Sequence, residues 1–274
     1  MVALGLPVFL LASIFIVGSN KQCQAQTRAS ASGRTPVLVE LFTSEGCSDC
    51  PPADNLLQKL DTFQPVPGAQ IIVLSEHVDY WNRLGWTDPF SSEFYTQRQS
   101  AYAERLGLSS VYTPQMVVDG TSEFVGSDER RAESAIEKAA SAPKVDIKVT
   151  GQSRDGKMEL HVEAGDASGK SADIYLVLAQ NSATSQVARG ENAGRTLNHV
   201  AVAREFRQIG TLEPWKSFSK DVRLELKPEL AHDPRLRAVV FAQGRGTGRV
   251  LGSSVATVAA ANVQSQGAAM GGHK

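Results

Sequence analysis

The sequence predicts an α/β domain, with a mixed sheet and flanking helices, followed by an all-β, sandwich-like domain. Over residues 35–141, apolar segments of strand length alternate with amphipathic segments of helical period. From residue 143 onward, short segments alternate apolar and polar residues between turns, which is typical of antiparallel sheets. The period changes at Ala142–Pro143. We therefore expect two domains, over residues 35–141 and 143–260.

Each element follows from local residue patterns. Pro51 and Pro52 suit the first turn of a helix, where the missing N–H has no helical partner, and Leu56 and Leu60 give that helix an apolar face. Ser127 is the expected cap of the third helix. The expected helices are residues 51–63, 92–106 and 128–140. The expected strands are residues 37–42, 70–75, 116–118, 123–125, 145–149, 158–162, 174–178, 222–226 and 236–241.

The N-terminal segment, residues 1–31, predicts a signal peptide and a disordered lead-in. Residues 2–18 are uncharged, apolar and short for a membrane span, and small-residue cleavage sites follow at Ala25 and Ala31. We expect a secreted or periplasmic protein with no membrane span in the mature chain. An uncleaved N-terminal anchor is the alternative. Residues 261–274 predict a disordered tail.

Charge and motif content exclude several classes of function. The net charge of -1 gives no reason to expect a nucleic-acid partner. The second domain shows no metal-ligand spacing, and its glycines Gly244, Gly246 and Gly248 precede a strand rather than a helix, which argues against a dinucleotide site. We therefore expect no cofactor.

Two cysteines separate the first strand from the first helix. Cys47 and Cys50 lie at the expected helix N-terminus, where the helix dipole favours a thiolate. Signal cleavage would remove Cys23 and leave this pair alone. A disulfide between residues so close contributes little loop-closure entropy, which favours a redox role. A local structural disulfide is the alternative, whereas a closed zinc site lacks its further ligands.

An aromatic-rich segment, residues 76–90, follows the second strand. Its position at the carboxyl end of a parallel strand predicts a substrate-binding surface, with Tyr80 and Trp81 as candidates. The alternative is that its aromatic side chains cover the core. His77 and Asp79 point to one side if the strand continues, so they are candidates for a hydrogen-bonded pair beside the cysteines. A histidine with a purely structural role is an equal alternative.

Three segments of the sequence, residues 40–54, 77–81 and 112–116, resemble a secreted thioredoxin-like family known as domain of unknown function 1223. This resemblance implies a thioredoxin-like first domain in which Pro114, preceded by Thr113, is cis and faces the cysteine pair. It also makes Glu40 the best match to an acidic residue beneath the dithiol. The resemblance implies no particular substrate, because none is established for the family.

These observations together predict an exported thiol-disulfide oxidoreductase that acts on protein thiols or disulfides, with an electron partner that the sequence does not indicate. Cys47, expected to be the more exposed cysteine, attacks as the thiolate, and Cys50 resolves the mixed disulfide. Pro114 keeps the groove open beside Thr113 for an extended substrate.

Four residues are candidates for tuning the reactivity of the cysteines: Asp49, Glu40, His77 and Asp79. Asp49 lies between the two cysteines, and its charge opposes a thiolate at Cys47. Two other classes of function stay open. One is a copper or other soft-metal site on Cys47 and Cys50, with His77 as a third ligand. The other is a non-catalytic protein-binding module.

Overall fold

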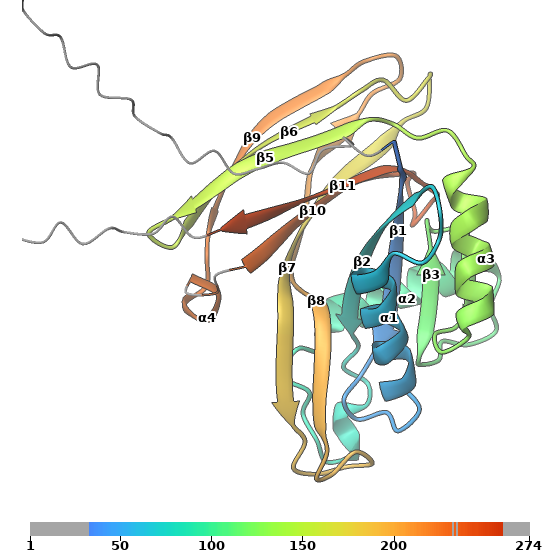
Figure 1. Ribbon diagram of the computed structural model, residues 1–274, viewed down its shortest axis with the longest axis vertical. Coiled ribbons are helices and arrows are strands. Elements are labelled where there is room, and N and C mark those ends of the chain that lie inside the picture. Colours follow the sequence, from blue (N-terminus) through green and yellow to red (C-terminus); the bar gives the residue numbers. More distant parts are fainter. Residues whose placement is uncertain (1–32, 232, 234, 260–274) are drawn as a thin grey trace, which may run out of the picture.

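The computed structural model describes residues 33–231, 233 and 235–259 of the chain (Figure 1). The predicted signal peptide and tail therefore lie outside the described residues. None of the helices within the described residues is long and apolar enough to cross a membrane.

Two sheets make up most of the structure. The larger sheet has eight strands in the order β11-β10-β7-β8-β2-β1-β3-β4, and the smaller has three in the order β5-β6-β9. The strands of the larger sheet are β1 (Thr35–Thr43), β2 (Ala69–His77), β3 (Gln115–Val118), β4 (Ser122–Val125), β7 (Ala172–Gln186), β8 (Thr196–Leu212), β10 (Arg235–Gln243) and β11 (Val250–Ala259). Those of the smaller sheet are β5 (Ile147–Arg154), β6 (Lys157–Ala164) and β9 (Phe218–Glu225).

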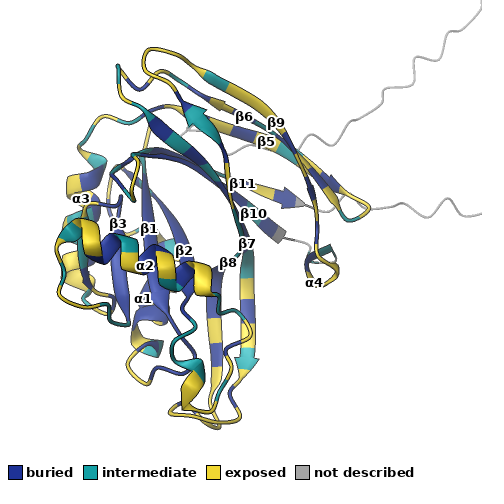
Figure 2. Cartoon of the chain, turned by 180° about the vertical axis from the view of Figure 1, so that it is seen from behind, coloured by how far each residue is buried: buried dark blue, intermediate teal, exposed yellow. Residues whose placement is uncertain are grey.

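Four α-helices occur in the described residues: α1 (Pro51–Phe63), α2 (Glu93–Leu106), α3 (Glu129–Ala140) and α4 (Pro228–Ala231). α1 and α3 lie in front of the β1–β3 part of the larger sheet in Figure 1, and α2 lies behind it. Figure 2, seen from behind, shows α2 in front with its buried side toward the sheet. A core of buried apolar residues fills the space around β1, β2, α1 and α3, and a second core lies between the two sheets.

The predicted fold class is wrong, because the described chain is mostly β and one sheet runs through both of its halves. β7, β8, β10 and β11, which follow Ala142–Pro143 in the sequence, continue the sheet that β1–β4 begin. The chain is therefore not a thioredoxin-like α/β domain followed by a separate β-sandwich. The domain boundary at residues 142–143 stays a prediction; it lies in the connection between α3 and β5.

β8 joins the two halves, and the sequence pattern predicts no strand there. Val202 of β8 pairs in parallel with Ser75 of β2, whereas β7 pairs antiparallel with β8 over most of its length. Five consecutive residues of β8, 199–203, are buried, and the charged residues 204, 205 and 207 follow them. A strand that is covered on both faces in one internal stretch and less covered on either side of it has no single apolar period, which explains why the pattern fails.

The predicted helices are confirmed, with bounds that local capping explains. α1 begins after Cys50 with proline in its first turn and ends before Gln64, which has a left-handed backbone. Ser92 caps α2 by accepting from the Phe94 N–H. The cap of α3 is Asp128, one residue after the predicted Ser127, because the carboxylate of Asp128 accepts from the Arg131 N–H.

A buried charged network lies between the larger sheet and α2. Arg98 of α2 donates through Nε to Glu40 Oε1 at 2.8 Å and through Nη2 to Gln243 Oε1 at 3.0 Å. The Tyr102 hydroxyl donates to Glu40 Oε2 at 2.6 Å. Arg98 Nε also lies 3.5 Å from Glu76 Oε2, a contact too poor for a hydrogen bond. Burial and the charge of Glu40 raise the pKa of Glu76 well above its usual value, and the charge of Arg98 opposes this only in part.

We predict that Glu76→Gln stabilises the protein at pH 7. A carboxyl with a raised folded pKa lowers the free energy of unfolding as the pH rises above its unfolded value of 4.5, and glutamine removes this titration. Thermal unfolding should show an increase in Tm of at least about 2 °C at pH 7 that disappears below pH 4. Glu104→Gln, at an exposed position of α2, is the control. A lower Tm at pH 7 for Glu76→Gln would contradict the prediction.

Candidate functional site

The disulfide Cys47–Cys50 lies between the end of β1 and the start of α1. Cys50 caps α1, and its carbonyl accepts from the N–H groups of Ala53 and Asp54, so the predicted position of the pair at a helix N-terminus is confirmed. Both cysteines are buried, with exposed fractions of 1% for Cys47 and 0% for Cys50. We expected Cys47 to be the more exposed cysteine, but in this conformation its exposed fraction exceeds that of Cys50 by only 1%.

Thr113 and Pro114, which the family resemblance places against the cysteine pair, lie beside the first turn of α1. The Thr113–Pro114 peptide bond is cis, as predicted. Gly126 donates its N–H to the Pro114 carbonyl at 2.9 Å, and a Cβ on Gly126 would lie 3.2 Å from Pro114 Cβ and 3.1 Å from Ala53 Cβ. A side chain at Gly126 would therefore require Pro114 and Ala53 to shift by a few tenths of an ångström. Trp81 Nε1 donates to Thr113 Oγ1 at 2.8 Å, which ties the aromatic segment to the same place.

Trp81 also covers one side of the disulfide loop. A Cβ on Gly46, next to Cys47, would lie 3.0 Å from Trp81 Cβ. Tyr80 turns instead toward α2 and donates its hydroxyl to Gln99 Oε1 at 3.3 Å. The Tyr80 hydroxyl also interacts with Thr113 and Trp81, so both aromatic residues lie beside the segment that holds Pro114. Their roles in substrate binding stay predictions.

The fully buried carboxylate of Glu45, two residues before Cys47, connects the disulfide loop to three other segments. Glu45 Oε2 accepts from Trp86 Nε1 at 2.7 Å and from Ser185 Oγ of β7 at 3.1 Å. Glu45 Oε1 lies 3.3 Å from His199 Nε2 of β8. The Glu45 N–H donates to Asp88 Oδ2 at 2.9 Å. The loop is therefore positioned by residues from both halves of the chain.

His199 is held between two carboxylates. Its Nε2 faces Glu45, and its Nδ1 lies 3.8 Å from Oδ1 of Asp54, a residue in the first turn of α1. Burial alone would lower the pKa of His199, but the carboxylates of Asp54 and Glu45 raise it to about 10. At neutral pH, His199 is thus a buried imidazolium beside the helix turn that carries Cys50.

His77 pairs with Asp88 rather than with Asp79. His77 Nδ1 lies 2.7 Å from Asp88 Oδ2, and the His77 ring lies 4.6 Å from that of His199, centroid to centroid. Burial alone would raise the pKa of Asp88, but the charge of His77 and the backbone N–H groups of Glu45 and Phe90 lower it. Asp79 accepts instead from Thr96 Oγ1 at 2.6 Å. The candidate pair of His77 and Asp79 therefore does not form.

The tip of the β7–β8 hairpin, residues 187–195, covers the other side of the disulfide loop. Asn192 donates through Nδ2 to the carbonyls of Glu45 at 2.9 Å and Cys47 at 2.8 Å. Glu191 Oε2 accepts from the Ser48 N–H at 3.0 Å. These contacts are made across more than 140 residues of sequence.

The remaining tuning candidates lie apart from these groups. Asp49 is exposed, and Glu40 faces α2 and binds Arg98. Sequence reasoning missed Asp54, Asp88, Asn192 and His199 as members of the site. Only Asp54 carries a signal in the sequence, because it lies three residues before Leu57 and so shares the buried side of the predicted helix.

A metal centre finds no support in the geometry. Within the described residues, no group of three or more His, Cys, Asp or Glu side chains could hold a metal ion. The sulfurs that would serve a soft metal are bonded to each other.

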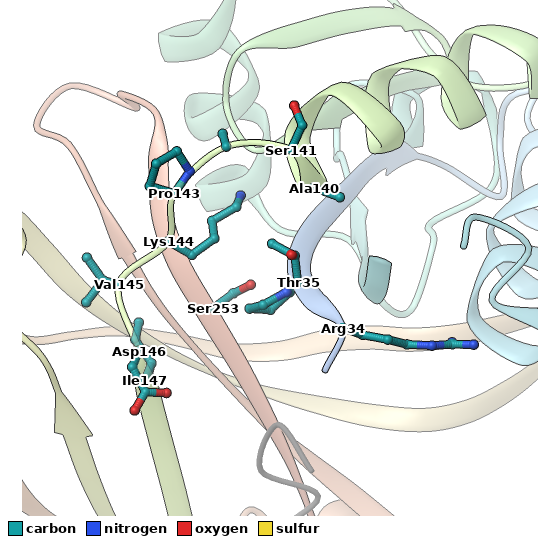
Figure 3. A pocket seen from close by; sticks show the side chains of 12 residues that line it. Arg34, Thr35, Ala140, Ser141, Pro143, Lys144, Val145, Asp146, Ile147 and Ser253 are labelled. Carbon is teal, nitrogen blue, oxygen red and sulfur yellow. The ribbon is translucent and has the colours of Figure 1, made fainter. Parts of the chain in front are cut away.

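A separate pocket of about 470 Å³ lies at the other end of β1 (Figure 3). It is lined by Thr35 at the start of β1, by the segment after α3 that includes Lys144, and by Ser253 of β11. Lys144 is paired with Asp119. Because the disulfide follows the last residue of β1, the length of the strand separates this pocket from the site.

Comparison with known proteins gives a family and a fold. The family model described as "Protein of unknown function (DUF1223)" matches residues 38–243. The structure of protein AGR_C_4864 from Agrobacterium tumefaciens is similar with a TM-score of 0.62 and 25% identity, and the match covers 82% of this chain and 96% of that one. HBP35 of Porphyromonas gingivalis matches with a TM-score of 0.61, 14% identity and coverages of 89% and 82%, which shows the fold alone. No curated protein matches.

We predict that Glu45→Gln destabilises the protein by about 3 kcal/mol at pH 7, because it leaves the His199 imidazolium buried without one of its two carboxylates. Stability from a raised histidine pKa is fully present below the unfolded value of 6.5 and is lost as the pH rises through about 10. The difference between the variant and the wild type should therefore shrink above pH 10.

The matched control for Glu45→Gln is Glu163→Gln, whose carboxylate lies 3.5 Å from the exposed His161. This exposed pair should contribute less than about 1 kcal/mol. Urea unfolding at pH 7 and above pH 10 measures both effects. Equal losses in the two variants would contradict a special role of the buried pair.

Proposed function

The chain belongs to the DUF1223 family of proteins of unknown function, and we propose that it carries out thiol-disulfide exchange at Cys47–Cys50 with protein thiols or disulfides as substrates. The observation that carries this proposal is the disulfide itself, which joins residues only three positions apart at the start of α1. Such a bond closes too short a loop to hold distant segments together, so a structural role explains it poorly.

The surroundings of the disulfide support the same chemistry. The first turn of α1 presents the positive end of the helix dipole to a thiolate formed at Cys47 or Cys50. Glu45 and Asp54 more than balance the charge of the buried His199 imidazolium, so the helix dipole is what favours a thiolate here. A thiolate that is stabilised in this way is a better leaving group, which speeds exchange.

The reaction balances with a dithiol substrate. One substrate thiolate attacks the Cys47 sulfur, the Cys47–Cys50 bond breaks, and Cys50 leaves as a thiolate. The second substrate thiolate then attacks the substrate sulfur of the mixed disulfide, and Cys47 leaves. The substrate is oxidised to a disulfide, the cysteine pair is reduced, and the two substrate protons pass to Cys47 and Cys50. In the reverse direction, the Cys47 thiolate attacks a substrate disulfide and Cys50 resolves the mixed disulfide.

We also propose that the chain is exported from the cytoplasm. A lone cysteine pair that works by exchange with other proteins suits a compartment outside the cytoplasm, where protein disulfides persist. The apolar segment and small-residue sites of residues 1–31 support a cleaved signal peptide. N-terminal sequencing of the mature protein tests this point.

We predict that Cys47→Ser abolishes exchange, whereas Cys50→Ser traps mixed disulfides, since only the second variant keeps the attacking sulfur without the one that resolves. The assay incubates each reduced variant with a disulfide-bonded protein and measures the covalent adduct on non-reducing gels. The double serine variant is the control. Equal trapping by the two single variants would contradict these roles. A wild-type protein that exchanges with no protein thiol or disulfide would favour a structural disulfide.

A further inference from the structure

The sulfurs of the candidate site are covered, although the loop that carries them reaches the surface. Ser48 and Asp49, between the two cysteines, are exposed, whereas Cys47 and Cys50 have exposed fractions of 1% and 0%. Exchange requires an attacking thiolate to reach a sulfur along the line of the S–S bond, so its rate depends on access. In the conformation described here, an incoming protein cannot make this approach.

The cover on one side is the tip of the β7–β8 hairpin, residues 187–195. Within this tip, only Val187 and Asn192 are buried, and the other residues are exposed. Asn192 binds the Cys47 and Glu45 carbonyls, and Glu191 accepts from the Ser48 N–H. Asn192 and Glu191 thus attach the tip to the disulfide loop through polar contacts, of which those of Asn192 are buried. Gly190 of the tip also packs against Trp86, because a Cβ on Gly190 would lie 3.4 Å from Trp86 Cβ.

The tip also has hydrogen bonds of its own, separate from its contacts with the disulfide loop. Gly194 donates its N–H to the Val187 carbonyl at 2.8 Å, and Val187 donates to the Arg195 carbonyl at 3.0 Å. Arg195 donates through its backbone N–H to the Asn192 carbonyl and through Nη1 to Asn192 Oδ1, both at 3.1 Å. A segment with internal hydrogen bonds and few buried apolar contacts can move away at low free-energy cost and close again.

We infer that the hairpin tip determines which thiols reach the Cys47–Cys50 disulfide, with Asn192 and Glu191 as the specificity-determining residues. This inference rests on the proposed exchange function. A small thiol needs only a slight displacement of the tip. A protein thiol needs the tip to move away, so its rate of exchange is proportional to the population of the open conformation.

The experiment compares two reductants of the oxidised protein: dithiothreitol and reduced, unfolded ribonuclease A. Stopped-flow tryptophan fluorescence or acid-quenched gels give the second-order rate constants. Asn192→Ala removes the hydrogen bonds to the Glu45 and Cys47 carbonyls. Glu191→Gln weakens the hydrogen bond from the Ser48 N–H at an exposed position. Asn198→Ala is the matched control, because Asn198 lies on the same hairpin and its exposed side chain binds only Thr184 among the described residues.

We expect Asn192→Ala to raise the rate with ribonuclease about tenfold, because the tip loses two hydrogen bonds, and the rate with dithiothreitol less than threefold. Glu191→Gln should change both rates in the same direction by smaller factors, and Asn198→Ala should change neither. If Asn192→Ala does not fold, a ribonuclease rate in Glu191→Gln that equals the wild-type rate overturns the inference.

Two results overturn the inference and separate it from the proposed function. If the wild type oxidises ribonuclease and both variants do so at the same rate, the tip does not control access, and the exchange function stands. If dithiothreitol reduces every variant but none of them oxidises ribonuclease, the inference and the proposed exchange with protein thiols fail together.

Discussion

The buried carboxylate of Glu45 is the constraint on which the rest of the site depends. A charged group without any exposed surface is tolerated only where hydrogen bonds and an opposite charge compensate the loss of water. Glu45 obtains them from Trp86, Ser185 and His199, which belong to a loop, β7 and β8. Because Glu45 precedes Cys47 by two residues, the same contacts fix the position of the disulfide loop.

The two halves of the chain are therefore joined by buried polar contacts as well as by a shared sheet. On one face of the larger sheet, Glu45 of the first half binds Ser185 and His199 of the second. On the α2 face, Arg98 binds Glu40 of β1 and Gln243 of β10. Each network would leave buried polar groups without partners if the halves separated, so the eight-stranded sheet is stabilised from both faces.

The sequence predicts those parts of the structure that depend on neighbouring residues. The prolines after Cys50 and the cap at Ser92 determine where α1 and α2 begin, and the family resemblance correctly implies the cis bond before Pro114. The parts that fail depend on distant partners. β8 has a mixed apolar pattern because its burial changes along its length, and His199 joins the site only through that strand. No rule on spacing connects residues 154 positions apart, such as Glu45 and His199.

The nature of the cover on the disulfide bears on whether the bond is structural or reactive. A disulfide that serves only the fold gains from permanent burial under apolar side chains, which exclude water and reductants alike. Here Trp81 covers one side of the disulfide loop. On the other side the cover is an asparagine and a glutamate that bind backbone groups of the loop, at the end of a hairpin whose other residues are mostly exposed. Each such hydrogen bond contributes only about 1 kcal/mol net, because water takes its place when the tip moves. Under the proposed exchange function, a closure of this strength would keep the disulfide covered most of the time and still allow frequent opening, as selective access requires.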